Sequence, residues 1–182
     1  MTLTKAEKVL VSKLQSGKLS QITEVLKEFN VNGSVPLIHY LFELVSTRKF
    51  QIIDNDILRI ISDIKEKDAV PVIVESLRKY DFKDKIADII ATCWQSSLDF
   101  SAYLDFFAEY FFKNDYQTSI EVFTVIEESL HNTTIPQRKS CLNIIEKNSG
   151  KVSEILKPLY NELHKLLKNS LELSIDNSKS IS

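Results

Sequence analysis

The sequence feature that most constrains the fold is an apolar pattern that returns along the chain at nearly even spacing. In each copy, apolar side chains fall at relative positions of about 0, 3, 4 and 7, which places them on one face of a helix. Successive copies are separated by 35, 29, 33 and 33 residues. One copy is found in any amphipathic helix, but five evenly spaced copies predict a helical repeat. The copies begin at Ile22, Ile57, Ile86, Ser119 and Val152.

A second apolar helix face precedes each copy, so the sequence predicts five antiparallel helical hairpins, or about ten helices. The hairpins are expected over residues 4–30, 34–66, 68–96, 99–131 and 134–168. Repeats of this length stack into an α-solenoid, because one hairpin cannot bury its apolar face alone. We therefore predict a single all-α, right-handed solenoid domain over residues 1–168. Residues 169–182 are rich in serine and predict a flexible polar tail.

Composition agrees with a helical protein and limits its partners. Three glycines and four prolines are too few to punctuate a fold of many strands. The net charge of −2 lacks the basic excess of a dedicated nucleic-acid binder. The sequence shows neither the apolar run of a signal peptide nor one long enough to span a membrane. These features lead us to expect a cytoplasmic protein with no membrane or nucleic-acid partner.

One segment carries a family resemblance. Residues 68–93 read DAVPVIVESLRKYDFKDKIADIIATC. This segment resembles a HEAT-type repeat, with an Ala-Val-Pro opening, an apolar first helix, a short turn containing aspartate, and a second helix with early lysines. Armadillo-like and other α-solenoid relatives remain open, because the arginine usual in the second helix of a HEAT repeat is not clear here. The resemblance implies a fold of stacked hairpins and, by analogy, a role in binding other proteins.

The resemblance also implies where a partner would bind. In HEAT-like arrays the second helix of each hairpin usually lines the concave face, and aligning the five copies gives two columns of exposed positions. The side chains of the first column are mostly acidic, and an acidic face favours a partner with a basic surface. The predicted partner-binding residues in these columns are Glu24, Arg59, Asp88, Glu121, Glu128 and Glu154.

More than half of the aromatic residues lie between Asp99 and Leu130. Large aromatics at helical spacing usually fill an interior, so most of this cluster is expected to be core. Phe112 lies nearest the polar stripe of its helix and is the exception that we expect at the surface. Exposed aromatics often anchor partner proteins, which makes Phe112 a seventh candidate.

The sequence offers no catalytic, metal or cofactor site. His39 and Glu43 are one helical turn apart, but a metal site needs three or four ligands. The predicted function is therefore a non-enzymatic scaffold or adaptor that binds a protein partner. The alternatives are an enzyme-accessory or lyase-like protein and, last, a nucleic-acid binder.

The last predicted helix raises two further expectations. Pro158 lies inside its pattern, so the helix should kink or restart near Lys157. The helix also carries Leu163, Leu166, Leu167 and Leu171. This apolar edge predicts either a monomer or a weak dimer formed through the C-terminal helix.

Overall fold

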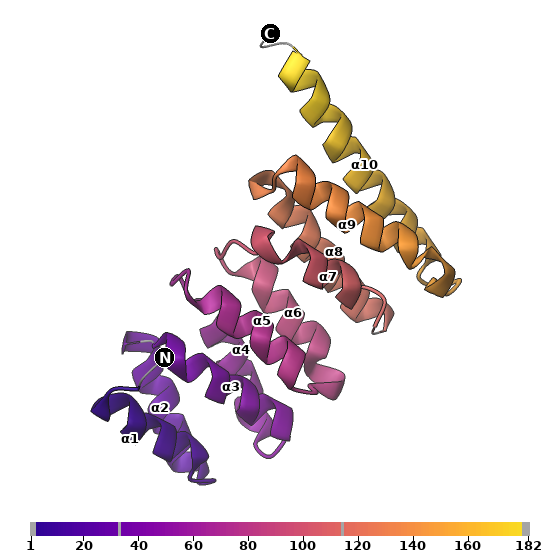
Figure 1. The fold of residues 1–182 in the computed structure, drawn as a ribbon. Coiled ribbons are helices and arrows are strands. Elements are labelled where there is room, and N and C mark those ends of the chain that lie inside the picture. The colour runs from indigo at the N-terminus through magenta and orange to yellow at the C-terminus, as the bar shows by residue number, and fades with distance from the viewer. Residues whose placement is uncertain (1–2, 33, 114, 180–182) are drawn as a thin grey trace. The chain divides into compact units, whose positions relative to one another are not determined.

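The computed structural model describes residues 3–32, 34–113 and 115–179, and this part of the chain is helical with no β-strand (Figure 1). It contains ten α-helices, which are connected by turns and by five single-turn 3-10 helices. The prediction of an all-α fold with about ten helices is therefore confirmed.

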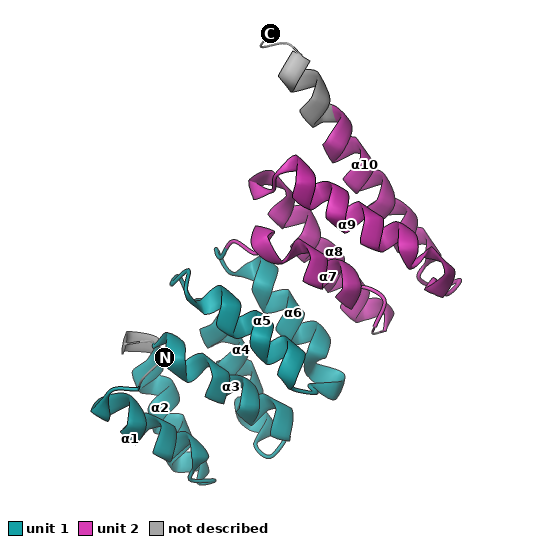
Figure 2. Cartoon of the chain, in the orientation of Figure 1, with its two compact units in different colours: residues 1–98 teal, residues 99–182 magenta. Residues whose placement is uncertain are grey.

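The chain divides into two compact units, residues 1–98 and residues 99–182 (Figure 2). The first unit holds α1 (Lys5–Gln15), α2 (Leu19–Asn32), α3 (Val35–Thr47), α4 (Asp54–Ser62), α5 (Ala69–Lys79) and α6 (Ile86–Gln95). The second unit holds α7 (Leu104–Tyr110), α8 (Tyr116–Ser129), α9 (Ile135–Lys147) and α10 (Lys157–Lys179).

In the first unit, helices pack on the helix two places further along the chain. Helix α1 packs on α3 and α3 on α5, while α2 packs on α4 and α4 on α6. Helix α1 also packs on α2, so the odd-numbered and even-numbered helices form two layers (Figure 1). In the second unit, α7 packs on α8 and α9, and α10 packs on both α8 and α9.

Side chains at the helix starts explain where several helices begin. The N–H of Thr4 donates to Glu7 at 2.7 Å, and the Thr4 hydroxyl accepts from the N–H of Glu7, so the first turn of α1 is a capping box. Asp115 accepts from the N–H of Thr118 at 2.8 Å at the start of α8. Such caps satisfy N–H groups that have no partner within the helix.

The repeated apolar pattern forms the core in its first four copies. All twelve side chains in the first three copies, Cys93 included, have relative solvent accessibilities below a tenth. In the fourth copy Ser119, Val122 and Ile126 are buried and Phe123 is partly buried. The pattern therefore identified the faces on which the layers pack.

The prediction that the fifth copy of the pattern begins a helix at Val152 is wrong. Residues 152–156 form turns rather than a helix, and the Ile155 side chain is 72% exposed. Pro158 explains the difference, because proline is tolerated in the first turn of a helix but not in its interior. Helix α10 begins at Lys157, so the predicted restart beside Pro158 is confirmed.

Helix α10 continues to Lys179 and so covers most of the segment for which the sequence predicts a polar tail. No glycine or proline follows Pro158 to end the helix. Leu163 and Leu167 are fully buried within the second unit, while Leu166 and Leu171 are half-buried. The two buried leucines are therefore not part of a free apolar edge.

An arginine at the end of α3 ties together two connections of the first unit. Arg48 has a φ of 57°, which ends α3. Its guanidinium lies 2.9 Å from the carboxylate of Asp54 and 3.0 Å from that of Asp84. Asp54 is buried, and burial raises its pKa while the positive charge of Arg48 opposes that rise.

Arg138 has a similar role in the second unit. Its guanidinium donates to the backbone carbonyl of Ser170 on α10 at 2.7 Å and to that of Leu130 at 2.9 Å. It also donates to the Thr133 hydroxyl at 2.9 Å. One side chain on α9 thus donates hydrogen bonds to carbonyl groups of two other segments of the second unit.

The two cysteines are expected to be unreactive in the folded protein. Cys93 and Cys141 are buried, and burial raises the pKa of each thiol to about 12. Because the thiolate is the nucleophile, Ellman's reagent at pH 8 should label both thiols only slowly in buffer and completely in urea. Immediate labelling of either thiol in buffer would contradict this packing.

Candidate functional site: a groove between α1 and α3

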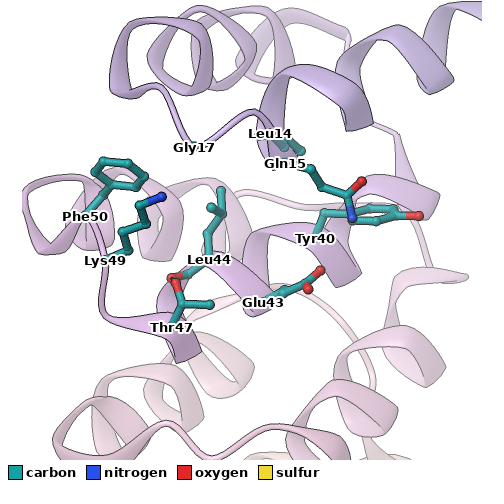
Figure 3. A pocket seen from close by; sticks show the side chains of 9 residues that line it. All are labelled: Leu14, Gln15, Gly17, Tyr40, Glu43, Leu44, Thr47, Lys49 and Phe50. Atoms are coloured by element: carbon teal, nitrogen blue, oxygen red, sulfur yellow. The ribbon is translucent and has the colours of Figure 1, made fainter.

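A groove of about 330 Å³ opens between the end of α1, the following loop, and the exposed side of α3 (Figure 3). This volume is at the lower end of the range found for small-ligand pockets. We call it the α1–α3 groove. Its lining residues are Leu14, Gln15, Gly17, Tyr40, Glu43, Leu44, Thr47, Lys49 and Phe50.

Two backbone features shape one end of the groove. Gly17 has a φ of 71°, a conformation that glycine adopts without strain. A Cβ atom at this position would lie 2.8 Å from the Lys49 Nζ. The absence of a side chain at Gly17 therefore lets the Lys49 amine lie against the loop that follows α1.

The neighbouring Arg48 fixes the turn that carries Lys49 and Phe50. Arg48 makes its two ion pairs to Asp54 and Asp84, which are not among the groove residues. The two side chains after Arg48 thus extend from an anchored backbone. The Lys49 ammonium lies 5.3 Å from the centre of the Phe50 ring, a cation–π distance.

The floor of the groove is apolar. Leu14 is fully buried, and Leu44 is half-buried between the two ends of the groove (Figure 3). Phe50 and Tyr40 are also half-buried and contribute aromatic faces at opposite ends. An apolar side chain from a ligand would find contacts on several sides here.

The rim carries polar groups that the protein itself leaves unpaired. Within the described residues, neither the Glu43 carboxylate nor the Lys49 ammonium forms an ion pair, and neither the Gln15 amide nor the Tyr40 hydroxyl forms a hydrogen bond. Glu43 and Tyr40 lie on one side of Leu44, and Lys49 lies on the other (Figure 3). The groove thus presents a negative and a positive charge across an apolar floor.

A hydrogen-bonded cluster joins α3 to α5 next to Glu43. The Nε2 atom of His39 lies 2.7 Å from the Tyr80 hydroxyl and 2.9 Å from the Lys79 ammonium, and its Nδ1 lies 3.5 Å from the Ser76 hydroxyl. The Tyr80 ring lies 5.1 Å from the His39 ring, centre to centre. These contacts hold the two helices together on the layer that contains the groove.

The charge states of this cluster favour a structural role. Burial lowers the pKa of His39, and the Lys79 charge lowers it further, while Glu43 and Glu75 oppose the shift. Burial also raises the pKa of Tyr80. A tyrosine that acts as a nucleophile or base needs a lowered pKa. The raised pKa of Tyr80 does not favour that role.

The structure places three predicted site residues on the even-numbered helices of the first unit. Glu24 lies on α2, Arg59 on α4 and Asp88 on α6, and all three reach the surface. Each forms an ion pair within its own surroundings: Glu24 with Lys13 at 2.9 Å, Asp88 with Lys85 at 2.9 Å, and Arg59 with Asp56 at 3.6 Å. The three positions therefore share a layer, but their charges are locally compensated.

The other four predicted residues lie in the second unit. Glu121 and Glu128 are on α8, and Glu128 lies 3.9 Å from His131. Glu154 lies in the turn before α10, and its exposed carboxylate lies 3.5 Å from Lys157. Phe112 is half-buried, and its ring lies 6.4 Å from that of Tyr160.

None of the seven predicted residues lines the α1–α3 groove. The residues that form it gave weak signals in the sequence, because Gly17 is an isolated glycine and Lys49 an isolated lysine. Their proximity depends on the left-handed turn at Arg48, which a helical period does not predict. The sequence signal for the groove is weak. It consists of Gly17 before α2 and the Arg48-Lys49-Phe50 segment after α3.

The described residues hold neither a candidate metal site nor a candidate membrane span. They contain no group of three or more histidine, cysteine, aspartate or glutamate side chains placed to hold a metal ion. Among the helices of the same residues, none combines the length and the apolar character that crossing a membrane requires.

Comparisons of the chain with protein-family models, with curated proteins and with solved structures found no match.

Proposed function

We propose that this protein is a non-enzymatic interaction scaffold and that each unit is a short stretch of HEAT-like or armadillo-like α-solenoid. The layered packing of the first unit supports the solenoid, because α1 to α4 each contact the helix two places further along. Such stacking gives a continuous core and leaves long helix faces for binding.

The observation that carries this proposal is the unpaired rim of the α1–α3 groove. Among the described residues, Glu43 and Lys49 form no ion pair, whereas Glu24, Asp88 and Glu154 each pair with a lysine. Exposed ion pairs contribute little and exchange readily, so the face of the even-numbered helices remains a second candidate surface. We place the principal contact at the groove, where apolar and charged groups meet.

The chemistry of the His39 cluster supports a binding role over an enzymatic one. The pKa shifts of His39 and Tyr80 both favour neutral side chains. The two cysteine thiols are buried with pKa values of about 12. These groups lack the activation that nucleophilic catalysis requires.

Site-specific photo-crosslinking tests the proposal. With benzoylphenylalanine in place of Gln15 at the rim, ultraviolet light should crosslink the protein in cell lysate to a defined partner, which mass spectrometry identifies. Benzoylphenylalanine in place of Lys139, an exposed residue on α9 that belongs to neither candidate surface, is the control and should give no such product.

A blocking variant makes the test specific to the groove. Leu44→Glu places a charge on the apolar floor at a half-buried position, so the fold is expected to persist. This substitution should reduce the Gln15 crosslink at least about tenfold, since burying a charge without a partner is costly. Equal crosslinking from Gln15 and from the control position, or an unchanged yield with Leu44→Glu, would reject the groove as the contact.

A further inference from the structure

The two unpaired charges at the rim of the α1–α3 groove restrict what can occupy it. Glu43 lies on one side of Leu44 and Lys49 on the other, and both lack an ion pair within the described residues (Figure 3). A ligand that covers the groove removes water from both charges. Desolvating a charge without supplying a partner costs free energy, so the ligand must bring a charge of the opposite sign to each side.

The floor between the charges restricts the middle of the ligand. Leu14 and Leu44 present aliphatic surface, and Phe50 and Tyr40 present ring faces at the two ends. A volume of about 330 Å³ has room for one large apolar side chain with its flanking backbone. The unpaired Gln15 amide and Tyr40 hydroxyl lie at the rim, where backbone groups of an extended peptide are able to pair with them.

We propose that the α1–α3 groove binds an extended segment of a partner protein in which an apolar residue lies between an acidic and a basic residue. The apolar side chain packs on Leu14 and Leu44. The acidic side chain pairs with Lys49, and the basic side chain pairs with Glu43. This proposal rests on the proposed function and adds the chemical class of the bound segment.

The Arg48 anchor gives the site its selectivity. Lys49 extends from a turn that Arg48 holds to Asp54 and Asp84, and its amine lies against the loop at Gly17. A positive charge in a fixed place discriminates between ligands better than a mobile one, because less conformational entropy is lost on binding.

The experiment uses four synthetic fluorescent peptides and the full-length protein. Each peptide has a central leucine, and its flanks are acid–base, base–acid, acid–acid or base–base. Fluorescence anisotropy measures the dissociation constants. The wild-type protein should bind at least one of the two mixed peptides about tenfold more tightly than either single-sign peptide.

Charge reversal of the rim should change this ranking in a defined order. Glu43→Lys should prefer the acid–acid peptide, and Lys49→Glu should prefer the base–base peptide. The double variant Glu43→Lys/Lys49→Glu should again prefer mixed peptides. Because Glu43 influences the charge of His39, Glu43→Gln serves as a milder variant, in which the preference for a basic flank should disappear.

Several results would overturn the inference. One is a set of dissociation constants that follows the total charge of the peptide and is the same for wild type and for the rim variants. Another is binding of free leucine without binding of any peptide, which would assign the groove to a small zwitterion. A Gln15 crosslink that depends on Leu44, combined with no charge rule among the peptides, would reject this inference and leave the proposed function standing. Loss of the Gln15 crosslink as well would reject both.

Discussion

Replacing Arg48 with alanine is expected to lower the free energy of unfolding by about 3 kcal/mol at pH 7.5, since removal of one partner leaves a buried charge uncompensated. The buried charge is the carboxylate of Asp54, whose side chain is 3% exposed and 2.9 Å from the guanidinium. The effect should be measured by urea unfolding followed through the fluorescence of Trp94, the single tryptophan, which lies in the same unit.

The cost of Arg48→Ala should shrink as the pH falls. Burial already raises the pKa of Asp54, and Arg48 limits that rise. Without Arg48, the folded-state pKa of Asp54 rises further above its unfolded value. The folded variant then binds a proton that the unfolded chain does not, so its stability falls as pH rises through that window and recovers on acidification. Relative to wild type, the variant should regain stability as the pH falls from 7.5 through the raised pKa of Asp54.

Two matched variants test the explanation for Arg48. Arg59 also pairs with an aspartate, but both partners are exposed, so Arg59→Ala should cost about 0.5 kcal/mol or less. The double variant Arg48→Ala/Asp54→Asn removes the stranded charge and should be more stable than Arg48→Ala alone at pH 7.5. Equal losses for the two arginine variants, or no rescue by Asp54→Asn, would show that Arg48 stabilises the chain by another route.

The helical period predicted which residues are buried with good accuracy. Ile22, Ile57 and Ile89 lie at the centres of packed faces because apolar side chains that recur on one side of a helix gain the most by packing there. This reasoning needs no knowledge of the tertiary fold. It therefore predicted the all-α class and the buried cysteines from the sequence.

The same reasoning failed where the backbone leaves the helix. Ile155 and Leu159 continue the period, but the helix begins only at Lys157, next to Pro158. Leu159 is therefore helical, whereas Ile155 lies in the preceding turn and is exposed. The groove is a second case, because it is formed by the turns at Gly17 and Arg48 rather than by a helix face. Side-chain periodicity does not report the φ angles of such turns, so it could not predict the charged rim of the α1–α3 groove.

The charge column predicted from the repeats illustrates a further limit. Glu24, Asp88 and Glu154 belong to one predicted column, and each lies at the surface. The period does not report the cation beside each of them, which is Lys13, Lys85 or Lys157. An alignment of repeats therefore finds exposed positions without revealing which charges remain available to a partner.

The second large effect is expected at Phe107 in α7. Its side chain is fully buried, and its ring makes edge-to-face contacts with Phe100 at 5.8 Å and Phe106 at 5.1 Å between ring centres. Phe107→Ala should lower the free energy of unfolding of the second unit by about 4 kcal/mol, which combines lost transfer energy and the cavity left behind. Hydrogen exchange of peptides from residues 104–147 should detect this loss, because Trp94 lies in the other unit.

Phe112 is the matched control, and it also tests the prediction made for this aromatic stretch. It lies five residues further along and is half-buried against Phe111 and Tyr160. Less apolar surface returns to water when it is truncated, so Phe112→Ala should cost about 1 kcal/mol. If Phe112→Ala proves as costly as Phe107→Ala, then Phe112 is part of the core and is not available to anchor a partner. A small loss leaves its exposed face free to contribute to binding, separately from the α1–α3 groove.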